Sequence, residues 1–268
     1  MRNVSVIIPT YNRECSIQRS VESVLRQGDF VKEIIVIDDR STDQTERVVK
    51  EIKDERILYR KPDRNLGAGG ARNFGVRLAS CDWIAFHDSD DEWLEGKLEK
   101  QFSYLESHEK VGLVYSAYRA QLASGEAIVV PQECGKSKLE GDIHADLLLR
   151  NTVGAPTILM RKDVFGEVGG FDEDMRSLED WDFAIRVSKR YEIGFLPEAL
   201  VQVHVTQGGV SSDMGAYYQN RCYMLRKHRA DYLKEGKFND AVRDLLIRAS
   251  EDHIQDKVEK MLVIFMSK

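Results

Sequence analysis

Short apolar runs alternate with amphipathic segments along the first hundred residues. The apolar runs are rich in β-branched residues and bounded by polar residues, which is typical of buried strands. These predicted strands lie at 4–8, 33–37, 57–59 and 83–86. Between them, apolar positions recur every three or four residues, as on one face of a helix. The predicted helices lie at 17–25, 41–52 and 67–79, with Ser41 as the cap of the second. This alternation predicts βαβ units, an α/β class and a mainly parallel sheet.

The second half of the chain is less regular. Apolar spacing predicts a helix over Leu94–Leu105 and another that opens at Glu179. Further strand-like segments lie at 113–115, 128–130 and 157–160. From about residue 217 onward the chain is rich in Leu, Lys, Arg and Glu with helical spacing, which predicts an appended helical pair.

Composition narrows the function classes. The 268 residues carry 39 Lys and Arg against 45 Asp and Glu, a formal net charge of −6, which disfavours nucleic acid as a partner. No apolar stretch approaches the ~18 residues of a membrane-spanning helix. The four cysteines are far apart in sequence and indicate free thiols rather than a disulfide framework. We therefore expect a cytoplasmic protein.

The strongest chemical signal is Asp88-Ser89-Asp90-Asp91, directly after the strand at 83–86. Carboxyl ends of parallel strands meet at one edge of a sheet, so this cluster is expected to face Thr10–Asn12 and Asp38–Asp39. Crowded carboxylates repel one another unless a proton or a cation neutralises them, and oxygen ligands of this kind suit Mg²⁺ or Mn²⁺. The alternative is a solvated acidic turn that caps the next helix.

Three weaker signals each have a structural alternative. Gly67–Asn73, which includes Arg72, presents backbone N–H groups for a pyrophosphate or is a plain tight turn. Glu179-Asp180 supplies a general base or only caps a helix. His204 is a structural histidine or a partner of the acidic cluster. The glycines do not form Gly-x-Gly-x-x-Gly after the first strand, so a NAD dehydrogenase is the weakest hypothesis.

Taken together and in order, these segments resemble the family 2 inverting glycosyltransferases. The resemblance covers about residues 4 to 210 and implies a GT-A fold, in which a Rossmann-like nucleotide-binding half and an acceptor-binding half share one sheet. It divides the chain into a glycosyltransferase domain and a C-terminal helical extension. The boundaries expected are 1–212 for the domain (1–110 nucleotide half, 111–212 acceptor half) and 213–268 for the extension. The motifs that carry it are Val4–Asn12, Ile35–Asp39, Ser41–Asp43, Asn65–Asn73, Asp88–Asp91 and Glu179-Asp180.

The resemblance implies roles in binding the nucleotide of a nucleotide-sugar donor. Thr10 and Tyr11 would contact the nucleotide, with Tyr11 flanking the base. Asp39 would accept from the uracil edge, which favours a UDP-sugar. Gly67 and Arg72 would lie near the base or the phosphates.

It also implies roles around the sugar that is transferred. Asp88 would contact the ribose, with Ser89 beside it in the nucleotide site. Asp90 would hold Mg²⁺ or Mn²⁺, and His204 resembles a residue near that metal. Asp180 resembles the general base that activates a hydroxyl of a saccharide or lipid-linked acceptor, in the synthesis of a polysaccharide or other glycoconjugate. Many members have Gly at Arg40 and an apolar residue at His87, departures that bear on donor choice.

Two further functions stay open on the sequence alone. A nucleotide-sugar-binding module without activity would keep the fold and not need Asp180. A sugar-phosphate nucleotidyltransferase would carry a Gly-rich, basic signature after the first strand, where this chain has Pro9–Arg13. The basic cluster Arg221–Arg229 is either an interfacial helix at the inner face of the cell membrane or an ordinary packing helix.

Overall fold

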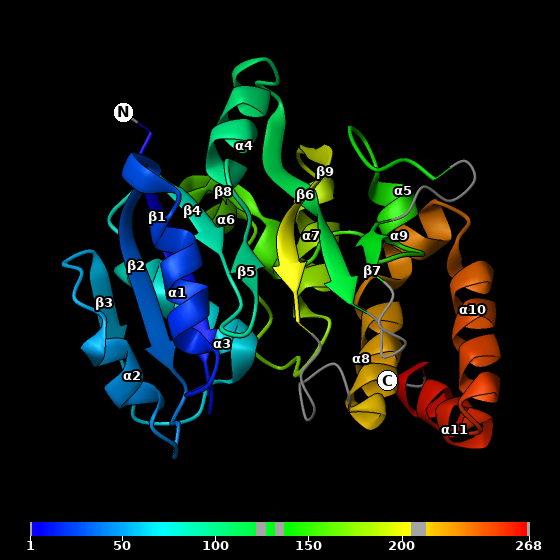
Figure 1. Cartoon of the computed structure of the whole chain (residues 1–268). Coiled ribbons are helices and arrows are strands. Elements are labelled where there is room, and N and C mark those ends of the chain that lie inside the picture. The colour runs from blue at the N-terminus through cyan, green and yellow to red at the C-terminus, as the bar shows by residue number, and fades with distance from the viewer. Residues whose placement is uncertain (1, 122–126, 132–136, 205–212, 267–268) are drawn as a thin grey trace.

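The computed structural model describes residues 2–121, 127–131, 137–204 and 213–266 (Figure 1). Its strands form one sheet in the order β3-β2-β1-β4-β8-β6-β9-β5, with β7 on β6. The α/β class and the C-terminal helices are confirmed. The strands are β1 Val4–Thr10, β2 Val31–Asp38, β3 Ile57–Arg60, β4 Trp83–Phe86, β5 Glu92–Trp93, β6 Val111–Gln121, β7 Ala127–Val130, β8 Leu159–Arg161 and β9 Glu192–Val203.

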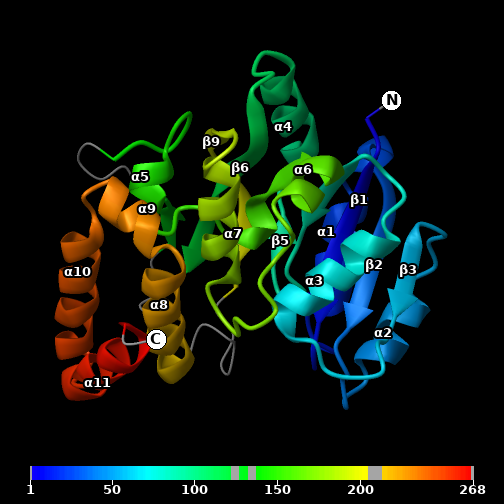
Figure 2. The same ribbon diagram turned by 180° about the vertical axis from the view of Figure 1, so that it is seen from behind.

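Helices cover both faces of this sheet, with α1 and α2 on one side and α3 on the other (Figures 1 and 2). β1 explains why both faces are covered: Val6 and Ile8 enter one apolar core with α1, whereas Ile7 enters the other with α3. The helices are α1 Ile17–Leu25, α2 Thr45–Glu51, α3 Gly67–Leu78, α4 Lys97–Glu106, α5 His144–Leu147, α6 Lys162–Glu167, α7 Glu179–Ser188, α8 Met214–Lys227, α9 Arg229–Lys234, α10 Phe238–Glu251 and α11 Gln255–Met266.

The strand order brings the carboxyl ends of β1, β2 and β4 together. All three are parallel, and Thr10 lies opposite Asp38 while Ile7 lies opposite Phe86. The chain runs outward from β1 to β2 and β3, then returns to place β4 on the other side of β1. Such a reversal leaves a crevice beyond the strand ends, where ligands bind in open α/β sheets.

Close packing of α3 on β1 yields a stability prediction. A Cβ at Gly75 would lie 2.5 Å from Cγ2 of Ile7, so Gly75→Ala is expected to lower the free energy of unfolding by about 1–3 kcal/mol. Gly166→Ala in α6 is the matched control, because no atom lies within 4 Å of its added Cβ. Urea denaturation of both variants is the measurement. Equal stability of the two would contradict this packing.

Several predicted boundaries are wrong in detail. α2 begins at Thr45 rather than near Ser41, because the Ser41 hydroxyl accepts from the Asn12 N–H, while the Asp43 carboxylate accepts from the Thr45 N–H. The helix predicted from Leu94 begins at Lys97, since β5 precedes it. The described part of the tail holds four helices rather than two, α8 to α11.

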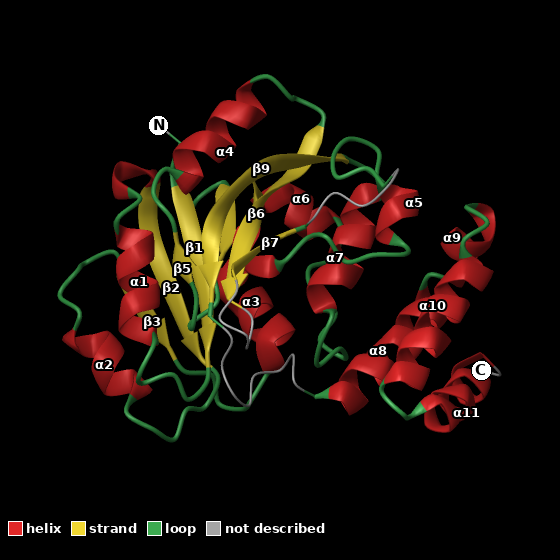
Figure 3. Cartoon of the chain, turned by 45° about the vertical axis from the view of Figure 1, so that its right-hand side comes forward, coloured by secondary structure: helices red, strands yellow, loops and turns green. Residues whose placement is uncertain are grey.

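The C-terminal helices share a core with the rest of the chain. Tyr218, Met224 and Leu225 of α8 are buried in the same apolar cluster as Trp181 and Phe183 of α7. Figure 3 displays α8, α10 and α11 side by side, beyond the end of the sheet. Within the described residues, no helix combines the length and apolar character needed to cross a bilayer.

The basic cluster at the end of α8 is largely engaged inside the protein. Arg221 and His228 are buried, and Lys227 pairs with Asp172 and Asp182. These contacts favour the interpretation of α8 as a packing helix. Cys15, Cys81 and Cys222 are free thiols, as expected, and Cys134 lies outside the described residues.

Candidate active site at the strand ends

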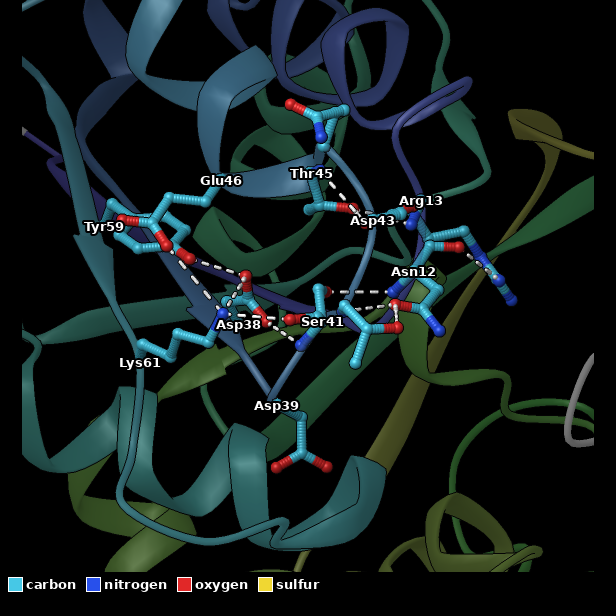
Figure 4. A network of polar contacts seen from close by, with 12 residues as sticks. Asn12, Arg13, Asp38, Asp39, Ser41, Asp43, Thr45, Glu46, Tyr59 and Lys61 are labelled. Carbon is cyan, nitrogen blue, oxygen red and sulfur yellow. Dashed lines mark hydrogen bonds and ion pairs between the residues drawn. The ribbon is translucent and has the colours of Figure 1, made fainter.

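Asp38 is the last residue of β2 and Asp39 follows it, and their side chains point in opposite directions (Figure 4). Asp38 is fully buried; its carboxylate accepts from the Ser41 N–H at 2.6 Å and the Tyr59 hydroxyl at 2.5 Å, with Lys61 at 3.8 Å. These contacts shape the loop after β2. Asp38 is therefore a structural residue, and Asp39 is the member of the pair that turns toward α3.

Asp39 ties β2 to the start of α3. Its two carboxylate oxygens accept from the N–H groups of Leu66 at 2.6 Å and Gly67 at 2.9 Å. Gly67 has a φ of +72°, which an L side chain rarely adopts, so glycine suits this position. Burial raises the pKa of Asp39. The backbone N–H of Gly67, a residue predicted to lie near the nucleotide, thus donates its hydrogen bond to Asp39.

Side chains of α1, and of Ser16 just before α1, hold the backbone of the acidic cluster that follows β4. The hydroxyls of Ser16 and Ser20 donate to the carbonyls of Ser89 and Asp88, both at 3.0 Å. Arg19 donates to the carbonyl of Asp90 at 2.7 Å. Three consecutive backbone carbonyls of this turn therefore accept hydrogen bonds, which fixes the positions from which its carboxylates project.

These carboxylates fit a divalent cation that is shared with phosphates. Burial and the neighbouring Asp88 raise the pKa of Asp91 to about 8, and burial raises the pKa of Asp88, so the cluster stabilises added positive charge. Within the described ranges no three acidic, His or Cys side chains form a metal cage. Mg²⁺ is commonly held by one or two carboxylates together with substrate phosphates, so Asp90 suits that arrangement.

Arg72 links the acidic cluster to the start of α7. It projects from α3, and its guanidinium lies 2.7 Å from Asp88 Oδ1 and 2.6 Å from Glu179 Oε1. The side chain is almost fully buried, and its two carboxylate neighbours offset its desolvation and raise its pKa. One helix therefore connects all three acidic groups: its first residue binds Asp39, and Arg72 binds Asp88 and the residue before Asp180.

Asp180 occupies the first turn of α7, partly exposed to solvent. Its carboxylate accepts from the Ala155 N–H and the Asn151 amide, both at 3.3 Å, and from the Trp181 N–H at 2.7 Å. Burial and the adjacent Glu179 raise the pKa of Asp180 to about 7. Glu179 is neutralised by Arg72, so Asp180 is the carboxylate suited to exchanging a proton near neutral pH.

The remaining predicted residues lie around the same strand ends. Tyr11 is exposed at 49% and Thr10 is buried, and the two are consecutive at the end of β1. His204, just after β9, donates its backbone N–H to Asp91 at 3.1 Å, and its ring Nε2 lies 2.9 Å from Glu92. It therefore reaches the acidic cluster, but its ring contacts Glu92.

The sequence alone did not identify three contributors. Burial and, less strongly, the charges of Asp180 and Asp91 raise the pKa of Tyr118 of β6, so its hydroxyl lies within electrostatic range of both carboxylates. Asn151 and Ala155 hold Asp180 from a loop with no regular pattern. Tyr118 lies beyond the strand-like segment predicted at 113–115, so nothing in the sequence distinguishes it.

Comparisons with known proteins identify relatives of this chain and structures that share its fold. A sequence model described as Glycosyl transferase family 2 matches residues 5–169. WfgD of Escherichia coli, a UDP-Glc:alpha-D-GlcNAc-diphosphoundecaprenol beta-1,3-glucosyltransferase, is 30% identical over 259 residues, which are 87% of this chain and 98% of WfgD.

Two solved structures share the fold. S. aureus TarS 1-349 in complex with UDP-GlcNAc superposes with a TM-score of 0.67 at 20% identity, covering 99% of this chain and 92% of TarS 1-349. The mannosyltransferase PcManGT from Pyrobaculum calidifontis, in complex with GDP-Man and Mn²⁺, gives a TM-score of 0.64 at 17% identity over 99% of this chain and 75% of its own.

Proposed function

Because the chain belongs to glycosyl transferase family 2, we propose that it transfers a sugar from a UDP-sugar to an acceptor hydroxyl with inversion at the anomeric carbon. The observation that carries this proposal is the buried bridge from Asp88 through Arg72 to Glu179. It ties the acidic cluster after β4 to the turn that carries Asp180. A donor diphosphate bound at the acidic cluster and an acceptor bound beside Asp180 would therefore meet in one crevice.

The donor half of the proposal rests on the ends of β1, β2 and β4. Tyr11 would stack on the base, beside the buried Thr10. Asp39 would accept a hydrogen bond from the uracil edge. Each of its carboxylate oxygens accepts only one of the two bonds from Leu66 and Gly67, so lone pairs remain for the base. Asp88 and Ser89 would face the ribose.

Asp90, with His204 near it, would hold Mg²⁺ or Mn²⁺ beside the donor diphosphate. Bound there, the cation would act as a Lewis acid that stabilises the charge on the departing diphosphate. PcManGT was solved with Mn²⁺, which supports divalent metal use here. Arg13, whose Nε lies 3.3 Å from Asp90, orients that carboxylate.

In the acceptor half, Asp180 would remove the proton of the acceptor hydroxyl as it attacks the anomeric carbon. Attack opposite the leaving diphosphate inverts the configuration of that carbon. Ala155 and Asn151 hold the carboxylate in place, so little reorganisation is needed when it takes the proton. The base contributes roughly 10²–10⁴-fold to the rate.

The relative WfgD suggests the chemical class of both substrates. Its name specifies UDP-glucose as donor and a GlcNAc-diphosphate lipid as acceptor. We propose a UDP-hexose donor and a saccharide or lipid-linked acceptor for this chain, at the cytoplasmic face of the membrane, in cell-envelope glycoconjugate synthesis.

The test is release of UDP from UDP-glucose or UDP-GlcNAc in the presence of Mn²⁺, with and without an alkyl-diphosphate GlcNAc acceptor. We expect acceptor-dependent release that EDTA abolishes. Binding of the donor with no release under any condition would instead indicate a module without activity.

The pKa of Asp180 predicts how transfer depends on pH. Below about pH 7 this carboxyl is protonated and cannot accept the acceptor proton, so kcat is expected to rise about ten-fold between pH 6 and pH 8. Initial rates at saturating UDP-sugar across this range are the measurement. A flat profile, or a rise centred near pH 4, would contradict the role of Asp180.

A further inference from the structure

α8 of the helical extension holds the chain on both sides of the proposed base. The Asn220 amide donates to the carbonyl and to the hydroxyl of Ser177, both at 3.0 Å. Lys227 Nζ lies 2.6 Å from Asp172 and 2.8 Å from Asp182. The segment from Asp172 to Asp182 is therefore attached to α8 at two points before α7 and at one point in its first turn, on either side of Asp180.

Arg221 makes the most unusual of these contacts. Its side chain is 1% exposed, and its guanidinium carbon lies 4.1 Å from the centroid of the Trp181 ring. Among the described residues its nitrogens form no ion pair and no hydrogen bond of ordinary geometry, and its polar neighbour is the hydroxyl of Tyr232, which donates its own hydrogen to the Leu148 carbonyl at 2.8 Å. Desolvating a guanidinium is unfavourable, so the face of Trp181, together with the Tyr232 oxygen, compensates for the lost hydration.

Trp181 connects Arg221 to Asp180. Its backbone N–H donates to the Asp180 carboxylate at 2.7 Å, and its ring N–H donates to the Leu147 carbonyl at 2.5 Å. Just before the pair of acids, Leu178 has a φ of +62°, a left-handed conformation that a leucine adopts only when its surroundings impose it. The contacts of α8 on both sides of Leu178 supply that constraint.

We propose that Arg221 is a positioning residue for sugar transfer: stacked on Trp181, it fixes the first turn of α7 and with it the carboxylate of Asp180. The helical extension then supports the catalytic centre through Trp181. This inference rests on the proposed function, because it assumes that Asp180 is the base.

Arg221→Met tests the inference, since it keeps an unbranched apolar stem and removes the guanidinium and its charge. We expect kcat to fall about 10- to 100-fold, because small displacements of a catalytic group cost this much. The KM for UDP-glucose should stay within about two-fold, because the donor site lies at the ends of β1, β2 and β4. Arg221→Lys, which keeps a cation over the ring, should recover most of kcat.

Arg226→Met is the matched control. Arg226 lies on the same helix, and its guanidinium lies 5.8 Å from the ring of Tyr223 and 5.7 Å from that of Phe265, both within the helical extension. We expect this variant to keep the kcat and KM of the unchanged enzyme. A fully folded Arg221→Met enzyme with unchanged kcat, or with a loss confined to KM, would overturn the inference.

Trp181→Phe keeps the test decisive if Arg221→Met does not fold. A phenyl ring binds a cation more weakly, so kcat should fall with KM unchanged, and unchanged kcat overturns the inference. Asp180→Asn separates the two proposals. If Asp180→Asn keeps full turnover, the proposed role of Asp180 fails; if it is inactive while Arg221→Met is fully active, only the role of Arg221 fails.

Discussion

Asp180→Asn is expected to lower kcat for sugar transfer by about 10²–10⁴-fold, with little change in donor binding. An amide has nearly the shape of the carboxylate, and its oxygen can still accept from Asn151 and Trp181 while only the bond from Ala155 is lost, so the fold should be retained. It cannot take a proton from an alcohol. The fall in kcat therefore reflects the loss of proton transfer. The measurement is kcat and KM for UDP-glucose in both enzymes.

Asp174→Asn is the control for that variant. Asp174 lies in the same connection before α7, is exposed, and contacts Asp172 only through its backbone N–H among the described residues. It should behave like the unchanged enzyme. Near-normal transfer by Asp180→Asn would remove Asp180 as the base and leave Glu179 and Asp182 as candidates, although both already pair with cations.

Asp90→Asn is expected to lower kcat about 10²–10³-fold and to raise the Mn²⁺ concentration needed for half-maximal activity. The amide keeps the volume of the side chain but loses the charge that would hold the cation. The Asp90 carbonyl still accepts from Arg19, so the turn should keep its shape.

Asp82→Asn serves as its control, because Asp82 is exposed and lies just before β4, at the opposite end of the strand from Asp90. Activity titrated with Mn²⁺ should be unchanged in this variant. Equal metal requirements in Asp90→Asn and the unchanged enzyme would exclude Asp90 as the metal ligand.

Sequence patterns predicted the strand ends because local chemistry sets them. Short apolar runs define β1, β2 and β4, and the polar residues that follow each run fall at one edge by the geometry of parallel strands. The start of α2 could not be predicted in the same way. Ser41 and Gln44 match a capping pattern, but a tertiary bond from Asn12 uses the Ser41 hydroxyl.

The positions of the acidic residues at the strand ends could be predicted from the sequence, whereas the contacts that link them could not. Arg72 was expected near phosphates, yet it also joins Asp88 to Glu179, a residue 107 positions away along the chain. The spacing of residues within a short sequence segment cannot predict a contact between residues so far apart along the chain. The same holds for Arg221 on Trp181, since a basic residue in an amphipathic helix gives no sign that it will be buried.

The configuration of the product tests the central claim most directly. UDP-glucose carries its sugar in the α configuration, and a single displacement assisted by Asp180 must produce a β-glycoside. Proton NMR of the purified product, through the coupling of its anomeric proton, distinguishes the two anomers. We predict a β-linked product; an α-linked product would contradict direct attack by a base-activated hydroxyl.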